Sequence, residues 1–203
     1  SIKPFPEKKV RPCVFEYIYF ARPDSILDGR NVYEVRKKIG HQLAKENCSD
    51  SEIIDVVIPI PDSGNASALG YAEKIGKPFE LGIIRNHYTG RTFIQESNSI
   101  RNLGVKLKHN PNINSFKNKN IALIDDSIVR GTTSVKIVEM LKNGGAKKIH
   151  MRIASPPVKF PCFYGIDTPN KNELLASKYT IEEVAKYIGV DSLKFIYLNG
   201  VYK

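Results

Sequence analysis

Two polar segments of this 203-residue chain combine residue types that bind phosphates and sugars. In the first, the acidic pair Asp125–Asp126 stands shortly before the hydroxyl-rich run 131–134, which reads Gly-Thr-Thr-Ser. A glycine and hydroxyl residues at the start of a helix present backbone amides to an anion, and a phosphate monoester suits them best. Carboxylates beside a phosphate repel it unless they bind sugar hydroxyls or a metal ion. The segment therefore indicates a site for a phosphorylated sugar; the alternative is that these residues only cap the helix.

The second segment is the turn 62–65, Asp-Ser-Gly-Asn, which follows the apolar run 53–58. Ligands of a parallel α/β sheet collect at the carboxyl ends of its strands, so both segments should open on one crevice. Consecutive strand residues point to opposite faces, and Asp125 and Asp126 can reach one ligand only if the chain turns there. The polar residues that follow the pair favour such a turn.

The elements that must position these segments alternate between strands and helices. Branched-aliphatic and aromatic runs predict strands, and apolar residues three to four positions apart predict helices. A capping box at Thr180–Glu183 and the glycines at 76, 144 and 189 mark helix ends. The strands are expected at 14–20, 53–58, 79–84, 121–124, 148–154 and 193–198, and the helices at 31–46, from 65 to 75, from about 132 to 143, and at 180–188. This alternation predicts an α/β fold, a mostly parallel sheet with helices on both faces.

Composition and length restrict the class of protein. A chain of 203 residues with 41% hydrophobic residues favours one domain. No stretch approaches the ~20 apolar residues of a membrane-spanning helix, so no membrane partner is expected. Three cysteines are too few for a disulfide framework, and we expect a cytoplasmic protein. The net charge of +10 fits a nucleic acid, an anionic small molecule or a solvated lysine face, and selects none of them.

The chain divides into a linker-like segment, residues 1–12, and one domain, residues 13–203. Within that domain about 35 residues, 85–120, show weak periodicity and several asparagines. A loop of that length inside a compact domain is usually a functional lid or disordered.

The segment 124–134 resembles the phosphoribosyl pyrophosphate (PRPP) motif of type I phosphoribosyltransferases. Four further segments, at 15–25, 59–63, 88–95 and 160–167, are similar to the amidophosphoribosyltransferases. This resemblance runs from about Cys13 to Lys203. It implies a type I phosphoribosyltransferase fold with a flexible lid loop at about 85–119. It also implies Mg²⁺-dependent transfer of the phosphoribosyl group of PRPP to ammonia, which gives 5-phosphoribosylamine and pyrophosphate in the first step of de novo purine biosynthesis.

The resemblance also assigns roles to residues of this sequence. Asp125 and Asp126 would hold the ribose hydroxyls and, with Ser63, contact Mg²⁺. The lid would contribute Tyr88 and Arg91 to catalysis, and Arg85 and His87 stand where the family usually has Lys and Arg. The positions implied in PRPP binding are Asp62, Ser63, Gly64, Asn65, Arg85, Asp125, Asp126, Ser127, Arg130, Gly131, Thr132, Thr133 and Ser134.

The family also implies partners and cofactors. Its N-terminal glutaminase domain has no counterpart in these residues, so free ammonia is the expected nitrogen donor. Purine nucleotides are implied as feedback inhibitors and a homo-oligomer as the assembly, and no nucleic acid is expected. Cys13 and Cys162 match two of four [4Fe–4S] positions; no iron–sulfur cluster is expected in this chain, because such clusters take four thiolates, and only a longer form of the chain could hold one.

Three other functions stay open. A base-salvage phosphoribosyltransferase shares the acidic pair and the hydroxyl-rich run. A PRPP-sensing regulator on the same fold would use the positive charge for RNA or DNA. The domain could also be catalytically inactive without its glutaminase partner. Release of pyrophosphate that depends on ammonia, on a base or on neither separates these functions.

Overall fold

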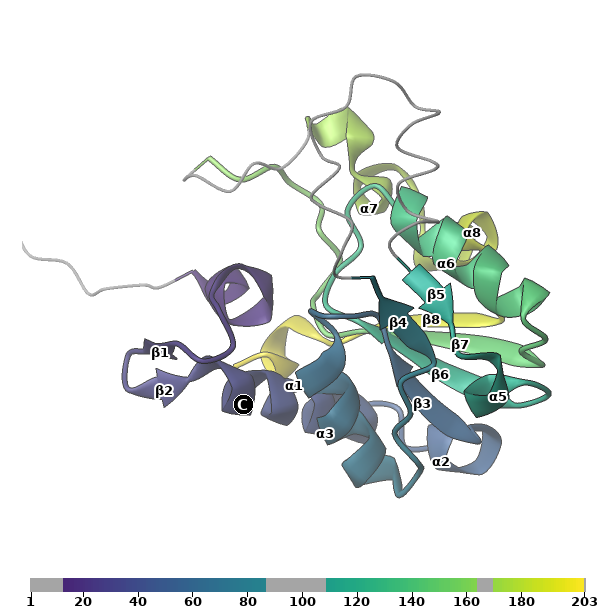
Figure 1. Cartoon of the computed structure of the whole chain (residues 1–203). Helices are drawn as coiled ribbons and strands as arrows, with labels where there is room; N and C mark the ends of the chain where they lie inside the picture. Colours follow the sequence, from purple (N-terminus) through teal and green to yellow (C-terminus); the bar gives the residue numbers. More distant parts are fainter. Residues whose placement is uncertain (1–12, 87–108, 164–169, 203) are drawn as a thin grey trace, which may run out of the picture.

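The central feature of the computed structural model is a four-stranded parallel sheet, in a structure that describes residues 13–86, 109–163 and 170–202 (Figure 1). Its strands are β3 (Val56–Pro59), β6 (Asn120–Asp125), β7 (Lys148–Ile153) and β8 (Ser192–Phe195), in that spatial order. All three pairings are parallel, with Val56 opposite Ile121 and Ile121 opposite Ile149. The predicted α/β class with a parallel sheet is confirmed.

Helices cover both faces of this sheet. On one face, α1 (Val32–Lys45) and α3 (Asn65–Ile75) pack on a core that includes Leu43, Tyr71 and Ile124. On the other, α6 (Thr132–Asn143) and α8 (Ile181–Ile188) pack on a core that includes Leu123 and Leu141. Successive residues of β6 therefore belong to two different cores. No helix of the described residues is long and apolar enough to cross a membrane.

Local sequence explains where the main helices begin and end. The Asn31 side chain accepts a hydrogen bond from the Glu34 amide and starts α1, as expected at 31. Thr180 and Glu183 form the predicted capping box of α8. Gly76 and Gly189 end α3 and α8 in the left-handed conformation that suits glycine. These helix predictions, and those of β6 and β7, are confirmed to within one or two residues.

Three strand predictions in the first half of the chain are wrong or incomplete. The aromatic run expected as a strand at 14–20 forms the π-helix η1 (Glu16–Phe20), because it packs on α1 through Ile18 and Arg36 of α1 binds two carbonyls at its turns. Residues at the start of the run 53–58 end a short helix, α2 (Asp50–Ile53), so β3 begins only at Val56. The segment 79–84 touches the sheet through one bridge, Phe79 to Val57, and then forms β4 (Ile83–Arg85).

The segment expected as a long loop contains regular structure at its end. β5 (His109–Pro111) pairs antiparallel with β4 and is followed by the helical turn α5 (Ile113–Phe116). The rest of the expected lid, 87–108, lies outside the described residues, as do 1–12.

The remaining elements are short. β1 (Ile26–Leu27) and β2 (Arg30–Asn31) form a hairpin before α1. Near the end of the chain, η2 (Lys171–Glu173) and α7 (Leu175–Lys178) precede α8. β8 (Ser192–Phe195) ends three residues before the end of the strand expected at 193–198, and Leu198 already begins η3 (Leu198–Gly200).

Candidate phosphoribosyl site

The two polar turns predicted to share a crevice leave neighbouring parallel strands. The turn 62–64 follows β3 and the acidic pair ends β6, and these strands are hydrogen-bonded neighbours. The Ile60 amide donates to the Ile124 carbonyl at 2.8 Å, and a methyl group at Gly64 would lie 2.6 Å from that same oxygen. Glycine at 64 is therefore required for the first turn to lie against β6. The peptide between Pro61 and Asp62 is cis.

The acidic pair is almost entirely buried. Asp125 is 9% exposed and Asp126 is 5% exposed. Asp125 is the last residue of β6 and shares the α6 face with Leu123, whereas Asp126 lies past the strand end, in the bend that the sequence predicted. An Asp125 carboxylate oxygen accepts the Asp126 amide at 2.9 Å.

Hydroxyl groups connect Asp126 to the first turn. The Ser127 hydroxyl donates to the Asp126 carboxylate, and Ser63 forms a second hydrogen bond to it. The structure thus brings together Ser63, Asp125 and Asp126, the three residues expected to contact Mg²⁺.

Burial sets the electrostatics of the pair. Burial and then the charge of Asp126 raise the pKa of Asp125 well above its usual range. Burial also raises the pKa of Asp126, against the opposing effects of the Ser127 and Ser63 hydrogen bonds and the positive charge of Arg36. Two carboxylates held this close without a cation are disfavoured in their ionised forms. The pair is therefore suited to a partner that supplies positive charge or hydroxyl donors.

The hydroxyl-rich run forms the beginning of α6. Gly131 precedes the helix with φ of 72°, and a methyl group there would lie 2.3 Å from Leu175 Cδ1. Thr132 and Thr133 are exposed, and Ser134 is buried. Because Gly131 has no side chain to cap the helix, the first amides of α6 remain available to an anion. Arg130 lies just before them and pairs with Glu173 at 2.7 Å.

Arg85, one of the residues expected to bind PRPP, contacts the first turn. Arg85 is the last residue of β4, and its guanidinium donates a hydrogen bond to the exposed Asp62 carboxylate. At the first residue of α3, directly after this turn, the Asn65 side-chain oxygen is buried with no hydrogen-bond partner in the described parts of the chain. The predicted catalytic residues Tyr88 and Arg91, and His87, fall outside the described residues.

Arg36 is a neighbour of the site that the sequence analysis missed. It lies on α1, is 3% exposed, and its charge acts on Asp126. The available signal was its spacing: position 36 falls on the apolar face of α1, between Val32 and Ile39, where an arginine needs a buried partner.

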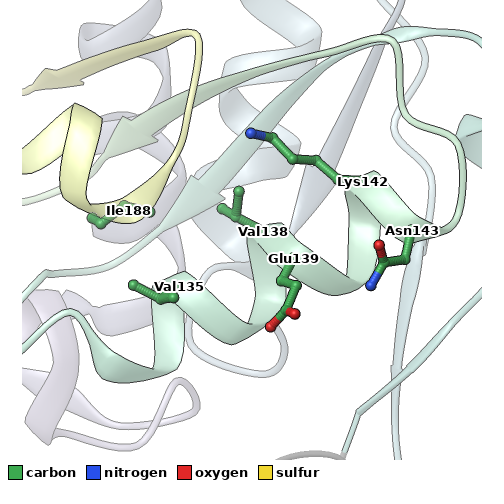
Figure 2. Close-up of a pocket in the computed structure, with 6 residues that line it drawn as sticks. All are labelled: Val135, Val138, Glu139, Lys142, Asn143 and Ile188. Carbon is green, nitrogen blue, oxygen red and sulfur yellow. The ribbon is translucent and has the colours of Figure 1, made fainter.

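Other features of the described residues are separate from this site. Two cavities of about 280 and 380 Å³ adjoin α6, and neither is lined by the acidic pair or the turn 62–64. Figure 2 shows the smaller one, with Val135 and Val138 of α6 facing Ile188 of α8. Cys13 and Cys162 form no disulfide. Within 13–86, 109–163 and 170–202, no three His, Cys, Asp or Glu side chains could hold a metal ion by themselves.

Comparison with known proteins agrees with this geometry. The phosphoribosyl transferase domain family matches residues 24–154, which contain both turns and the acidic pair. The chain belongs to the phosphoribosyltransferase family. Within that family it is 57% identical to the amidophosphoribosyltransferase of Rhizobium etli over 99% of this chain and 40% of the relative, and 53% identical to that of Methanocaldococcus jannaschii over 94% and 40%.

A solved structure of an amidotransferase also matches this phosphoribosyltransferase chain. The glutamine PRPP amidotransferase of Bacillus subtilis, complexed with ADP and GMP, is 49% identical, with a TM-score of 0.83 over 93% of this chain and 41% of that one. The chain thus spans about 40% of the length of these relatives.

Proposed function

We propose that this chain transfers the phosphoribosyl group of PRPP to ammonia, giving 5-phosphoribosylamine and pyrophosphate at the start of purine biosynthesis. One observation carries the proposal: a buried acidic pair lies between a glycine-led helix N-terminus and a Ser-Gly turn on adjacent parallel strands. A phosphate, a ribose and a diphosphate need these three surfaces in this order. The resemblance to amidophosphoribosyltransferases supports ammonia as the acceptor.

The residues act mainly by positioning and by charge. The amides of 131–134 would bind the 5-phosphate, and the turn 62–65 with Arg85 would bind the diphosphate. Asp125 and Asp126 would accept hydrogen bonds from the ribose hydroxyls. As the bond from C1 to the pyrophosphate oxygen breaks, positive charge develops on the sugar ring, and carboxylates beside the ring stabilise it. Ammonia then forms the new C1–N bond with inversion and loses a proton.

The residues present fit a magnesium ion that is shared with the substrate. Asp125 and Asp126 are two adjacent buried carboxylates whose ionised forms a bound cation would favour, and Ser63 would add a neutral oxygen ligand. Mg²⁺ is usually held by one or two carboxylates together with substrate phosphates, which agrees with a site that has no third acidic ligand among the described residues. When bound, the ion would neutralise charge on the leaving pyrophosphate.

The partners follow from the relatives. Because those proteins are more than twice as long as this chain, we propose that a glutaminase part supplies the ammonia in the complete enzyme. The Bacillus structure holds ADP and GMP, and we propose purine nucleotides as competitors for the PRPP site. Tyr88 and Arg91 remain predicted lid residues. We also propose a homo-oligomer and a cytoplasmic location, although some relatives are chloroplastic.

The test is release of pyrophosphate from PRPP and Mg²⁺, with ammonium above pH 8. Asp125→Asn and Asp126→Asn should each lower turnover at least ~10²-fold, the scale of losing one charge-stabilising group. Glu139→Gln, an exposed carboxylate of α6, is the matched control and should keep the wild-type rate. Release that needs a purine or pyrimidine base would favour the salvage reaction instead, and wild-type rates in both aspartate variants would refute the site.

A further inference from the structure

Arg130 forms an ion pair beside the entrance of α6, the residues 131–134 that are assigned to the 5-phosphate. Its Nε donates a hydrogen bond to a Glu173 carboxylate oxygen at 2.7 Å. Within the described residues, Nη1 and Nη2 of the same guanidinium form no hydrogen bond. The Arg130 side chain is 54% exposed, so a ligand can reach it. The pair therefore leaves the forked end of the guanidinium available to an anion.

The segment that carries Glu173 is fixed against this entrance. Glu173 is the last residue of η2, and the two residues that follow it are buried. The Leu175 amide donates to the Val129 carbonyl at 3.0 Å, and Leu175 Cδ1 would lie 2.3 Å from a methyl group at Gly131. In Figure 1, α7, which begins at Leu175, lies next to the start of α6. The backbone beside Glu173 is therefore held against the entrance of α6.

The two partners of the ion pair differ in freedom. Glu173 stands on an anchored backbone, whereas Arg130 has a long side chain that must lose rotamer freedom when it binds a phosphate. Because the guanidinium is planar, a carboxylate that holds Nε also fixes the plane of both Nη groups and removes part of that cost before the ligand arrives. The Glu173 charge repels a phosphate, but both side chains of the pair are exposed and solvent screens this repulsion.

We propose that Glu173 is a positioning residue for the 5-phosphate of PRPP. It holds Arg130 through Nε, so that both Nη groups can donate to phosphate oxygens at the entrance of α6. The inference rests on the proposed function and adds to it a residue from outside the PRPP-binding segments. Glu173 lies 43 positions from Arg130, so the segment that resembles the PRPP motif contains the arginine but not its partner.

The test measures the 5-phosphate and diphosphate subsites separately in Glu173→Ala, Glu173→Gln and Arg130→Met. Thermal midpoints are recorded, and the KM for PRPP and kcat are measured with saturating ammonium and Mg²⁺. Calorimetry gives the dissociation constants of ribose 5-phosphate, which carries the group assigned to α6, and of pyrophosphate with Mg²⁺, which carries the group assigned to 62–65. Glu73→Ala is the matched control, because Glu73 pairs with Lys37 at the same distance of 2.7 Å, near the far end of α3.

Glu173→Ala should raise the KM for PRPP and the dissociation constant of ribose 5-phosphate about 3- to 5-fold, the scale of one exposed ion pair. Binding of pyrophosphate should not weaken, and the change should fall on KM and not on kcat, because the 5-phosphate is bound alike in substrate and transition state. Glu173→Gln keeps an oxygen that accepts from Nε and should recover most of the loss.

Arg130→Met should raise the same two constants at least ~10-fold, the size of a lost charged hydrogen bond. Adding Glu173→Ala to Arg130→Met should change nothing further, because the carboxylate then has no guanidinium to hold. The control Glu73→Ala should keep the wild-type constants.

A lowered thermal midpoint with wild-type constants in Glu173→Ala would show a structural role only and overturn the inference. Constants that fall in both Glu173 variants would show that the carboxylate competes with the phosphate for Arg130, which also overturns it. Neither result touches the proposed function, because the wild-type chain would still use PRPP. A wild-type chain that neither binds nor turns over PRPP would overturn the proposed function, and this inference with it.

Discussion

Replacing Gly131 with alanine tests the helix entrance that is assigned to the 5-phosphate. Gly131 has φ of 72°, a conformation that costs an alanine ~1–2 kcal/mol. Gly76, at the end of α3, has nearly the same φ of 68°. The two positions differ in their surroundings: a methyl group at Gly76 meets nothing within 4 Å, whereas one at Gly131 would lie 2.3 Å from Leu175 Cδ1. Gly76→Ala is therefore a control that carries the same backbone cost.

The different surroundings of Gly76 and Gly131 set the expected changes in the thermal midpoint and in KM. At about 2–4 °C per kcal/mol for a chain of this size, Gly76→Ala should lower the thermal midpoint by roughly 2–8 °C and leave the KM for PRPP unchanged. Gly131→Ala should lower the midpoint further, because Leu175 is buried and its amide is bonded to the Val129 carbonyl at 3.0 Å, so the turn must shift. That shift should raise the KM for PRPP at least ~10-fold, about 1.4 kcal/mol of lost binding.

The assay is thermal unfolding together with pyrophosphate release at varied PRPP. Equal midpoints for the two variants would show that Leu175 does not constrain the turn. A wild-type KM in Gly131→Ala would refute the assignment of this helix entrance to the phosphate.

Two further predictions concern buried charge. Burial raises the folded-state pKa of Asp125 above its unfolded value, so the folded protein binds more protons in this range and loses stability as pH rises. Asp125→Asn should therefore raise the thermal midpoint at pH 7–8 but not near pH 3, even though its turnover is expected to fall. A midpoint that falls equally at both pH values would contradict this. Arg152→Met leaves the buried Asp50 carboxylate without its guanidinium partner and should lower the free energy of unfolding by about 3–5 kcal/mol. Denaturant titration measures this loss. A loss below about 1 kcal/mol, which is the range of an exposed ion pair, would contradict the prediction.

Sequence patterns predicted the elements whose signals are local. The capping box at Thr180 and the glycine after Ile75 each place a helix end within the chain segment that forms it. The branched-aliphatic run 53–58 predicted a strand buried on both faces, and all four residues of β3 are buried. The acidic pair and the turn 62–65 were found for the same reason, since each follows its strand directly.

The wrong or missed predictions have a different physical origin, because contacts with residues far away in the sequence determine the structure of those segments. η1 has the aromatic composition of a strand, yet its carbonyls are held by Arg36, which lies 15–19 positions further along the chain. Asp50 and Arg152 lie 102 positions apart, and no local pattern links them. The ion pair between Arg85 and Asp62 depends in the same way on how β4 meets the first turn.

The placement of β6 has a consequence for engineering this protein. Successive residues of β6 belong to separate hydrophobic layers, Leu123 to the layer built with α6 and α8 and Ile124 to the layer built with α1 and α3, and the acidic pair follows directly. A substitution that repacks only one layer would therefore tilt the end of β6 and move the acidic pair relative to the turn 62–64. Efforts to make the fold more heat-resistant should therefore alter both layers together, or turnover will be lost before stability is gained.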